Sequence, residues 1–322
     1  MTDSDHTLAP ESVLDAAARI APHATVTPVL QARSIDADAG AALHFKAEHL
    51  QRVGAFKFRG ACNAVFSLSD HDAARGVVTH SSGNHGAALA LAARLRGIPC
   101  HVVAPDGAVP AKLASIQRYG ATLHHCAATI AAREAACAKL HDDTGGTVIH
   151  PYTHPWVIAG QGTAALELLS ARPELDALVV PLGGGGLAAG TALAIQTLQR
   201  DCALYLAEPV GAADGARSFA GGMLDHDFVP DTVCDGLRGS LGAINFGLLR
   251  TTGARVLTVD DADTLATQQM ILARMKQVVE PSSAIALAAV LGNRALFTDR
   301  RVGIVLTGGN VDLAALAGPL RA

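Results

Sequence analysis

Short apolar runs alternate with longer alanine- and leucine-rich segments along this chain. Brief runs of β-branched residues are typical of buried strands, and longer periodic segments predict helices. In the first half we expect strands at 43–47, 76–79, 101–103, 122–124 and 147–149. We expect helices at 11–20, 57–68, 87–96, 110–119 and 127–141, and a loop at 142–146. Residues 76–149 therefore alternate strand and helix, which predicts one doubly wound unit.

The same alternation restarts in the second half of the chain. We expect helices at 155–169, 187–198, 261–278 and 282–297, and strands at 178–180, 204–207, 256–259 and 302–306. The glycine-rich stretch 208–251 has no such period, as expected of a functional loop region. The pattern predicts α/β architecture from end to end, without a tandem repeat.

Composition narrows the class of protein. The chain has 322 residues, 50% of them hydrophobic, and a net charge of -4, so it can bury an ample core and offers no basic face for nucleic acid. The N-terminus is polar and acidic, which argues against a secretory signal, and no apolar run is long enough to span a bilayer. Six cysteines are scattered without a CxxC pair. We interpret them as reduced residues of a cytoplasmic protein.

A lysine stands at a strand-to-helix turn, within Gly54-Ala55-Phe56-Lys57-Phe58-Arg59-Gly60. Its amine can react at neutral pH only if desolvation or a carbonyl partner changes its ordinary pKa of about 10.4. A solvated lysine at the start of a helix explains this stretch equally simply, and the stretch alone favours that interpretation.

The four consecutive glycines Gly183–Gly186 follow a predicted strand and open a helix. Backbone N–H groups without side chains can surround a phosphate there, assisted by the helix dipole. The alternative is a structural turn, for which four glycines would be costly. Gly183, Gly185 and Ala188, with Glu208 after the next strand, also fit a loose dinucleotide pattern, so a nicotinamide-dependent oxidoreductase is a competitor. No Lys-Ser/Thr follows the glycines, which excludes a nucleoside triphosphatase loop.

Two more motifs follow predicted strands. Ser81-Ser82-Gly83-Asn84-His85-Gly86 could bind a carboxylate through its N–H groups and move protons through its hydroxyls, although an ordinary helix cap explains it equally. Thr307-Gly308-Gly309-Asn310 follows the last strand, at the edge where ligands of open α/β sheets bind, and a tight turn is the alternative.

Taken together and in order, these motifs resemble the fold-type II pyridoxal-phosphate enzymes. The resemblance covers nearly the whole chain and includes the segments 48–61, 81–86, 158–163, 183–186, 280–281 and 307–312. It is strongest with the branch that holds serine racemase, threonine and serine dehydratases and hydroxyaspartate dehydratases. It implies two doubly wound three-layer αβα domains, similar to the tryptophan synthase β chain, with the active site in the cleft between them. Residues 1–75 and 150–322 would form the large cofactor-binding domain and residues 76–149 the small one.

The resemblance assigns cofactor roles residue by residue. Lys57 would hold pyridoxal phosphate as a Schiff base and move the Cα proton, with Phe56 against the ring. The remaining cofactor-binding residues would be Asn84 on the ring hydroxyl, Gly183, Gly184, Gly185 and Gly186 on the phosphate, Thr307 facing the ring nitrogen, and Glu280. A hydroxyl beside that nitrogen weakens the electron sink and favours prompt β-elimination over a long-lived carbanion.

The resemblance also implies substrate and metal residues. Ser82 would handle the proton on the face opposite Lys57. The substrate-binding residues would be Ser81, Ser82, Gly83, Asn84, His85 and Arg133, and the divalent-cation ligands Glu208, the Ala212 carbonyl and Asp214. Oxygen ligands of this kind suit Mg²⁺ or Ca²⁺, and a solvated acidic loop is the alternative. Three residues near the crossover between the domains are candidates for lining the pocket: His150, Tyr152 and His154.

The sequence therefore predicts a homodimeric pyridoxal-phosphate dehydratase that acts on a β-hydroxy amino acid. We expect 3-hydroxyaspartate, because Ala55 stands where serine and threonine dehydratases usually have a hydroxyl, and because Arg133 could pair with a second carboxylate. Thr307 replaces the more usual serine and keeps the hydroxyl. Serine or threonine dehydration and serine racemisation are close alternatives. A nicotinamide enzyme and a non-catalytic small-molecule sensor are the alternatives from other classes.

Overall fold

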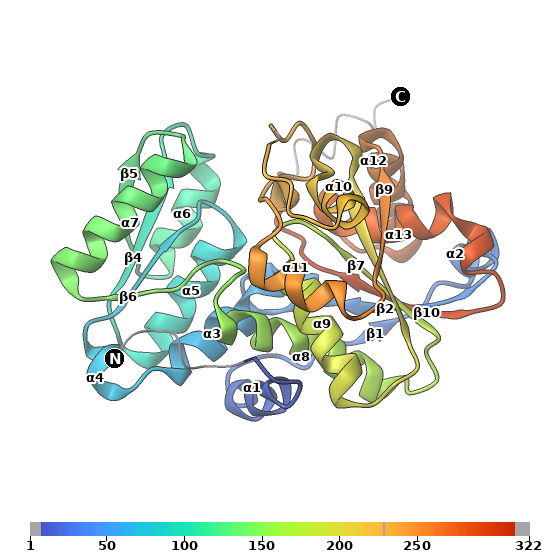
Figure 1. The fold of residues 1–322 in the computed structure, drawn as a ribbon, viewed down its shortest axis with the longest axis horizontal. Helices are drawn as coiled ribbons and strands as arrows, with labels where there is room; N and C mark the ends of the chain where they lie inside the picture. The colour runs from blue at the N-terminus through green and yellow to red at the C-terminus, as the bar shows by residue number, and fades with distance from the viewer. Residues whose placement is uncertain (1–7, 228, 313–322) are drawn as a thin grey trace.

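Two mostly parallel sheets organise the protein, whose structure is a computed structural model that describes residues 8–227 and 229–312 (Figure 1). The large sheet has the order β1-β2-β10-β7-β8-β9, in which only the β1–β2 pair is antiparallel. Its strands are β1 (Val29–Leu30), β2 (Ala42–Ala47), β7 (Ala177–Pro181), β8 (Ala203–Pro209), β9 (Arg255–Val259) and β10 (Arg301–Leu306). Strand β10 pairs in parallel with both β2 and β7, so the last described strand lies between earlier ones.

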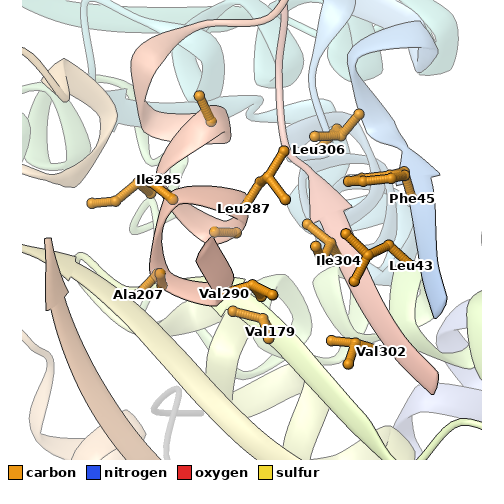
Figure 2. Packing of buried hydrophobic residues seen from close by; sticks show 14 of the residues in the cluster. Leu43, Phe45, Val179, Ala207, Ile285, Leu287, Val290, Val302, Ile304 and Leu306 are labelled. Carbon is orange, nitrogen blue, oxygen red and sulfur yellow. The ribbon is translucent and has the colours of Figure 1, made fainter. Parts of the chain in front are cut away.

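Helices cover both faces of the large sheet because its strands are apolar on both sides. On one face, Val179 belongs to an apolar cluster with residues of α13 (Pro281–Gly292), and Figure 2 shows it beside Val290 of that helix. On the other face, the neighbouring residues Leu178 and Val180 pack with α8 (Pro155–Ala171) and α9 (Gly186–Thr197). The helices α1 (Ser12–Ile20), α2 (Arg33–Ala39), α11 (Ala243–Arg250) and α12 (Asp261–Met270) complete the two outer layers.

The small sheet is entirely parallel, in the order β5-β4-β3-β6. It consists of β3 (Val77–His80), β4 (Cys100–Pro105), β5 (Thr122–Cys126) and β6 (Thr147–Val148). Helices α5 (Asn84–Arg96) and α6 (Pro110–Arg118) cover one face and α7 (Ile130–Thr144) the other. The predicted α/β class, with two domains and parallel sheets, is confirmed.

Helix α3 (Lys57–Ser67) joins the two halves, because it packs against α5 of the small sheet and α8 of the large one. Its buried residues belong to the same apolar cluster as those of α5. The short helix α4 (Asp70–Ala74) leads from it into β3. We propose the small domain as residues 76–149 and the large one as 1–75 with 150–322, so that α3 is the element of the large domain on which the small one rests.

Several predicted elements differ from the structure. The helix expected at 282–297 is α13, which ends at Gly292. The stretch 208–251, expected to be irregular, holds α10 (Asp214–Gly221) and α11, which are too short to show a clear period. Helix α7 extends to Thr144, into the predicted loop at 142–146, and ends at the left-handed Gly145. The helix expected at 261–278 ends in a π-helical turn at Met275, because Lys276 adopts a left-handed conformation with φ 60°. Within residues 8–227 and 229–312, no helix has the length and apolarity needed to cross a membrane.

Candidate active site

The turn before α3 is fastened to the end of β10, at the carboxyl edge of the large sheet. Ala55 and Gly308 form an antiparallel bridge. The N–H of Phe56 donates a hydrogen bond of 3.0 Å to the carbonyl oxygen of Thr307. Two motifs from opposite ends of the sequence therefore meet where α/β sheets bind their ligands.

Lys57 is the first residue of α3, and its side chain is half-buried. Its Nζ donates to the carbonyl oxygen of Pro151 at 3.1 Å and lies 5.2 Å from the centroid of the Phe56 ring. Burial lowers the pKa of the Lys57 ammonium to about 8, against the opposing effect of the Glu280 carboxylate. An amine with this pKa has an appreciable neutral fraction near neutral pH, as a nucleophile or proton acceptor requires.

A buried network of charges holds the other side of α3. Arg59 is fully buried and donates to Glu48 at 2.6 and 2.8 Å and to Glu167 at 2.7 and 2.9 Å. Lys46 donates to Glu167 at 2.5 Å and to the carbonyl oxygen of Thr27 at 2.6 Å. In the sequence, Arg59 stands out only as part of the lysine motif, and no pattern marks Glu48 and Glu167 as its partners. The network fixes the first turn of α3, from which Lys57 projects.

The glycine loop Gly183–Gly186 leads from β7 into α9 and is closely packed. A Cβ on Gly184 would lie 2.4 Å from the Tyr152 ring, and Gly185 has a φ of 87°. Among the described residues, the N–H groups of Gly183, Gly184 and Gly185 find no hydrogen-bond acceptor. Unpaired N–H groups at a helix N-terminus are what a phosphate requires, so this loop fits the phosphate of the predicted cofactor.

Asn84 bridges the two halves of the protein at the start of α5. Its Nδ2 donates to both carboxylate oxygens of Glu280 at 3.1 Å, and its Oδ1 accepts from Asn310 at 2.8 Å. Burial raises the pKa of Glu280 to about 7, although the hydrogen bond from Asn84 opposes the rise. A second link joins Lys112 of α6 to Asp235. The carboxamide of Asn84 is thus held at a fixed orientation over the candidate site.

Two sets of hydroxyl groups lie at these strand ends. The buried Thr307 places its Oγ1 3.5 Å from the carbonyl oxygen of Ser282. Ser81, Ser82 and Gly83 form the half-buried turn between β3 and α5, in which the N–H of Gly83 donates to Ser81 Oγ at 3.3 Å. These groups lie at the ends of β10 and β3, respectively, as the sequence predicts.

Two histidines, His85 and His150, lie within electrostatic reach of Lys57. Burial lowers the pKa of His150 to about 3, and the charge of Lys57 adds to this effect. The buried His85 also has a pKa well below its usual value, because of burial and then Lys57. The rings of His80 and His150 lie 5.2 Å apart, in an edge-on arrangement. The site therefore lacks positive charge on these imidazoles at neutral pH.

Arg133 lies on α7 within electrostatic reach of His80. Burial lowers the pKa of His80 and the Arg133 charge lowers it further, against the effect of Glu134. The Nε of Arg133 is buried and has no hydrogen-bond partner among the described residues. A guanidinium with an unused donor beside a site is suited to a carboxylate.

The crossover after β6 contributes three aromatic side chains. The His150 ring lies 4.5 Å from the Tyr152 ring, which packs on the glycine loop. His154 caps α8, where its Nδ1 accepts from the N–H of Trp156 at 3.3 Å. His150 and Tyr152 thus connect the histidines near Lys57 to the glycine loop, whereas the ring of His154 supports α8.

Glu208 near the end of β8 and Asp214 at the start of α10 are two buried acidic residues. Both oxygens of Glu208 accept hydrogen bonds, of 2.8 and 2.7 Å, from backbone N–H groups of α10. Burial raises the pKa of Glu208 to about 8, with the Asp214 charge adding to it, and burial also raises the pKa of Asp214. Ala212 is buried beside them on a short turn. Two carboxylates buried close to one another fit a divalent cation, whose charge would offset the cost of burying them.

Two residues of this region escaped the sequence analysis altogether. His80 directly precedes the Ser81 motif at the end of β3, a position that could have indicated a role. Asn245 of α11 donates from Nδ2 to the carbonyl oxygens of Gly184 and Tyr152, at 2.6 and 2.9 Å. It lies in the stretch expected to be irregular, and no sequence signal marks it.

Comparison with known proteins agrees with this geometry. Residues 20–308 match the family described as pyridoxal-phosphate dependent enzyme. The chain is 45% identical to the beta-hydroxyaspartate dehydratase of Paracoccus denitrificans, covering 95% of this chain and 97% of that protein. It is 46% identical to the serine racemase of Arabidopsis thaliana, covering 95% and 94%. The solved structure of maize serine racemase superposes with a TM-score of 0.94 at 42% identity, covering 98% of this chain and 97% of that one.

Proposed function

The chain belongs to the pyridoxal-phosphate dependent enzyme family, and from this premise we propose that it is a dehydratase that releases ammonia from a β-hydroxy amino acid. The family match is supported by relatives named as a hydroxyaspartate dehydratase and as serine racemases. The observation that carries the proposal is the half-buried Lys57, whose pKa burial lowers to about 8 at the carboxyl edge of the sheet.

We assign the cofactor-binding roles on the family resemblance, which the contacts of these residues support. When bound, pyridoxal phosphate supplies an electron sink for the Cα of an amino acid. The N–H groups of Gly183–Gly186 would bind its phosphate, and Lys57 would hold its aldehyde carbon. Phe56 would lie against the ring, and the Thr307 hydroxyl would face the ring nitrogen. Asn84, which Glu280 and Asn310 hold in place, binds the ring hydroxyl.

Lys57 also carries the proton chemistry. Once the substrate amine has displaced it from the cofactor, the neutral Nζ would accept the Cα proton, and the β-hydroxyl would leave as water with that proton. The released imine takes up water and yields an oxo acid and ammonia, so the water lost in the first stage is regained in the second. The neutral imidazoles of His85 and His150 leave Lys57 as the principal basic nitrogen, because burial keeps their pKa values low.

The small domain offers a positively charged group, Arg133, that could bind a second carboxylate of the substrate. Arg133 has an unused buried Nε and lies within electrostatic reach of His80. A dicarboxylic substrate would pair with that guanidinium, whereas the side chain of serine would leave it without a partner. We therefore favour 3-hydroxyaspartate, which gives oxaloacetate and ammonia.

An ammonia-release assay tests the reaction directly. Purified protein loaded with pyridoxal phosphate is incubated with serine, threonine and each 3-hydroxyaspartate stereoisomer, and ammonia and oxo acid are measured. We expect the highest kcat/KM with one hydroxyaspartate stereoisomer. Cofactor binding without turnover of any of these substrates would instead favour a small-molecule sensor and refute the dehydratase.

Arg133→Ala should raise the KM for 3-hydroxyaspartate about tenfold or more and change the KM for serine little, because only the former has a carboxylate for the guanidinium. The measurement is steady-state kinetics with both substrates. Arg94→Ala is the matched control, since Arg94 is an exposed arginine of α5 in the same small domain. Equal effects of Arg133→Ala on the two substrates would refute its assignment to the second carboxylate.

Racemisation is a second candidate activity for the same site. Serine racemases are among the relatives, and Ser82 lies half-buried in the turn at the end of β3, where its hydroxyl could return a proton to the face opposite Lys57. Chiral chromatography of serine after incubation tests this activity. Formation of oxo acid without any D-serine would exclude it.

We also propose that Glu208, the Ala212 carbonyl and Asp214 hold a divalent cation, Mg²⁺ by preference. The two carboxylates are fully buried and close enough for Asp214 to raise the pKa of Glu208, which a cation would offset. Such a cation would hold the loop after β8 against α10. Added Mg²⁺ should raise the melting temperature by about 2–4 °C in the protein and not in Glu208→Gln. An equal response in both would refute the site.

The remaining proposals concern the whole molecule. We propose a homodimer in the cytoplasm, on the same family resemblance and on the absence of any disulfide among the cysteines, all of which lie in the described ranges. Light scattering of the purified protein would decide the mass of the assembly.

A further inference from the structure

Asn245 lies under the glycine loop, fully buried on α11. Its Nδ2 donates to the carbonyl oxygen of Gly184 at 2.6 Å and to that of Tyr152 at 2.9 Å. The N–H of Gly242 donates to the same Gly184 oxygen at 3.2 Å. One side chain therefore ties the glycine loop to the crossover between the two sheets.

Anchoring the Gly184 carbonyl also fixes the direction of the next N–H group. The C=O of Gly184 and the N–H of Gly185 belong to one planar peptide unit, and no described peptide bond is cis. In a trans peptide these two groups point in opposite directions. Because the carbonyl points to α11, the N–H of Gly185 points to the other side, where no described residue accepts it.

The chemistry of the site requires an amide at position 245. The Asn245 Oδ1 is buried and no described residue donates to it, so the two N–H contacts are what the side chain contributes. A carboxylate there would face two carbonyl oxygens and lose both donors. A Cβ on Gly185 would lie 2.9 Å from the Asn245 Cβ, so the packing leaves the loop little freedom to reorient.

We propose that Asn245 is a positioning residue of the phosphate site, which aims the Gly185 N–H at the phosphate of pyridoxal phosphate by holding the opposite end of the same peptide. This inference rests on the family's cofactor and not on the identity of the substrate. It assigns to α11 a role in cofactor affinity, through a residue that touches neither the substrate nor the reacting atoms.

The test compares the affinities of the cofactor-free protein for pyridoxal phosphate and for pyridoxal, which lacks the phosphate. Binding is followed by quenching of the single tryptophan, Trp156, and by visible absorption. We expect Asn245→Ala to weaken binding of pyridoxal phosphate about tenfold to a hundredfold and binding of pyridoxal less than about threefold. The matched control is Asn293→Ala, because Asn293 also donates to a backbone carbonyl, at 2.9 Å, but caps the far end of α13.

Equal weakening for both ligands, or none for either, would overturn the proposal. Asn245→Ser, which keeps one donor, should recover part of the phosphate-dependent affinity. If both variants fail to fold, hydrogen exchange on the unchanged chain decides: pyridoxal phosphate must slow exchange of the Gly185 amide, and an unchanged rate refutes the proposal. An unaltered protein that does not prefer pyridoxal phosphate to pyridoxal would instead contradict the cofactor assignment itself.

Discussion

Lys57→Ala is expected to lower kcat for ammonia release by about 10⁴-fold and to remove the visible absorption of the bound cofactor. The reason is that one Nζ serves both to hold the cofactor and to accept the Cα proton. No described residue near it offers a substitute: the histidines around it have lowered pKa values, that of His150 to about 3. The measurements are single-turnover ammonia release and an absorption spectrum of the purified variant.

Lys139→Ala is the matched control for this experiment. Lys139 lies exposed on α7, where it pairs with Asp143 at 2.6 Å, so its loss should leave both the spectrum and kcat within about twofold of the original. Retention by Lys57→Ala of more than about a tenth of the original kcat would contradict the central role of this lysine.

Arg59→Met is expected to lower the free energy of unfolding by about 3–5 kcal/mol. Arg59 and Glu48 are both fully buried, and the arginine makes four hydrogen bonds to the two carboxylates of Glu48 and Glu167. Without the guanidinium, Glu48 remains as a buried charge without its partner. Urea unfolding followed by circular dichroism gives the value, provided that the slope with denaturant stays unchanged.

A surface arginine provides the comparison for Arg59. Arg301 makes a similar two-pronged contact with Asp176, at 2.7 and 3.0 Å, but in solvent, so Arg301→Met should cost no more than about 1 kcal/mol. The double variant Arg59→Met, Glu48→Gln should regain part of the stability, because it removes the stranded charge. If Arg59→Met unfolds no more easily than Arg301→Met, the buried network does not stabilise the fold as we argue.

The residues of the candidate site that belong to a local sequence motif could be predicted from the sequence. Lys57, the glycine loop and Thr307 each follow a strand, and the carboxyl ends of parallel strands converge, so their meeting could be expected. The pairing of Arg59 with Glu167 could not be expected from the sequence. It joins two helices, α3 and α8, whose residues are about a hundred positions apart. Buried charge partners leave no periodic signal, and here even Lys46 looks like the polar interruption of an apolar strand.

The other features that the sequence did not predict are short helices, a side chain that holds a loop, and the end of one helix. The region 208–251 has too few turns per helix for its period to be visible, and Asn245 therefore carried no mark of its position under Gly184. The left-handed Lys276 ended a helix that the apolar pattern would have continued, because backbone conformation at one residue outweighed side-chain periodicity. Both are decided by tertiary packing, which a pattern along one chain does not contain.

The central position of β10 has a consequence for biosynthesis. During synthesis, β2 and β7 leave the ribosome long before β10, which lies between them in the folded sheet. Until β10 emerges, each of the two strands has one hydrogen-bonding edge without a partner. The turn before Lys57 cannot take its final position earlier either, because Ala55 forms its bridge with Gly308, which follows β10 in the chain. The large sheet therefore cannot close before β10 has left the ribosome, and until then its open edges are exposed to aggregation and to chaperones.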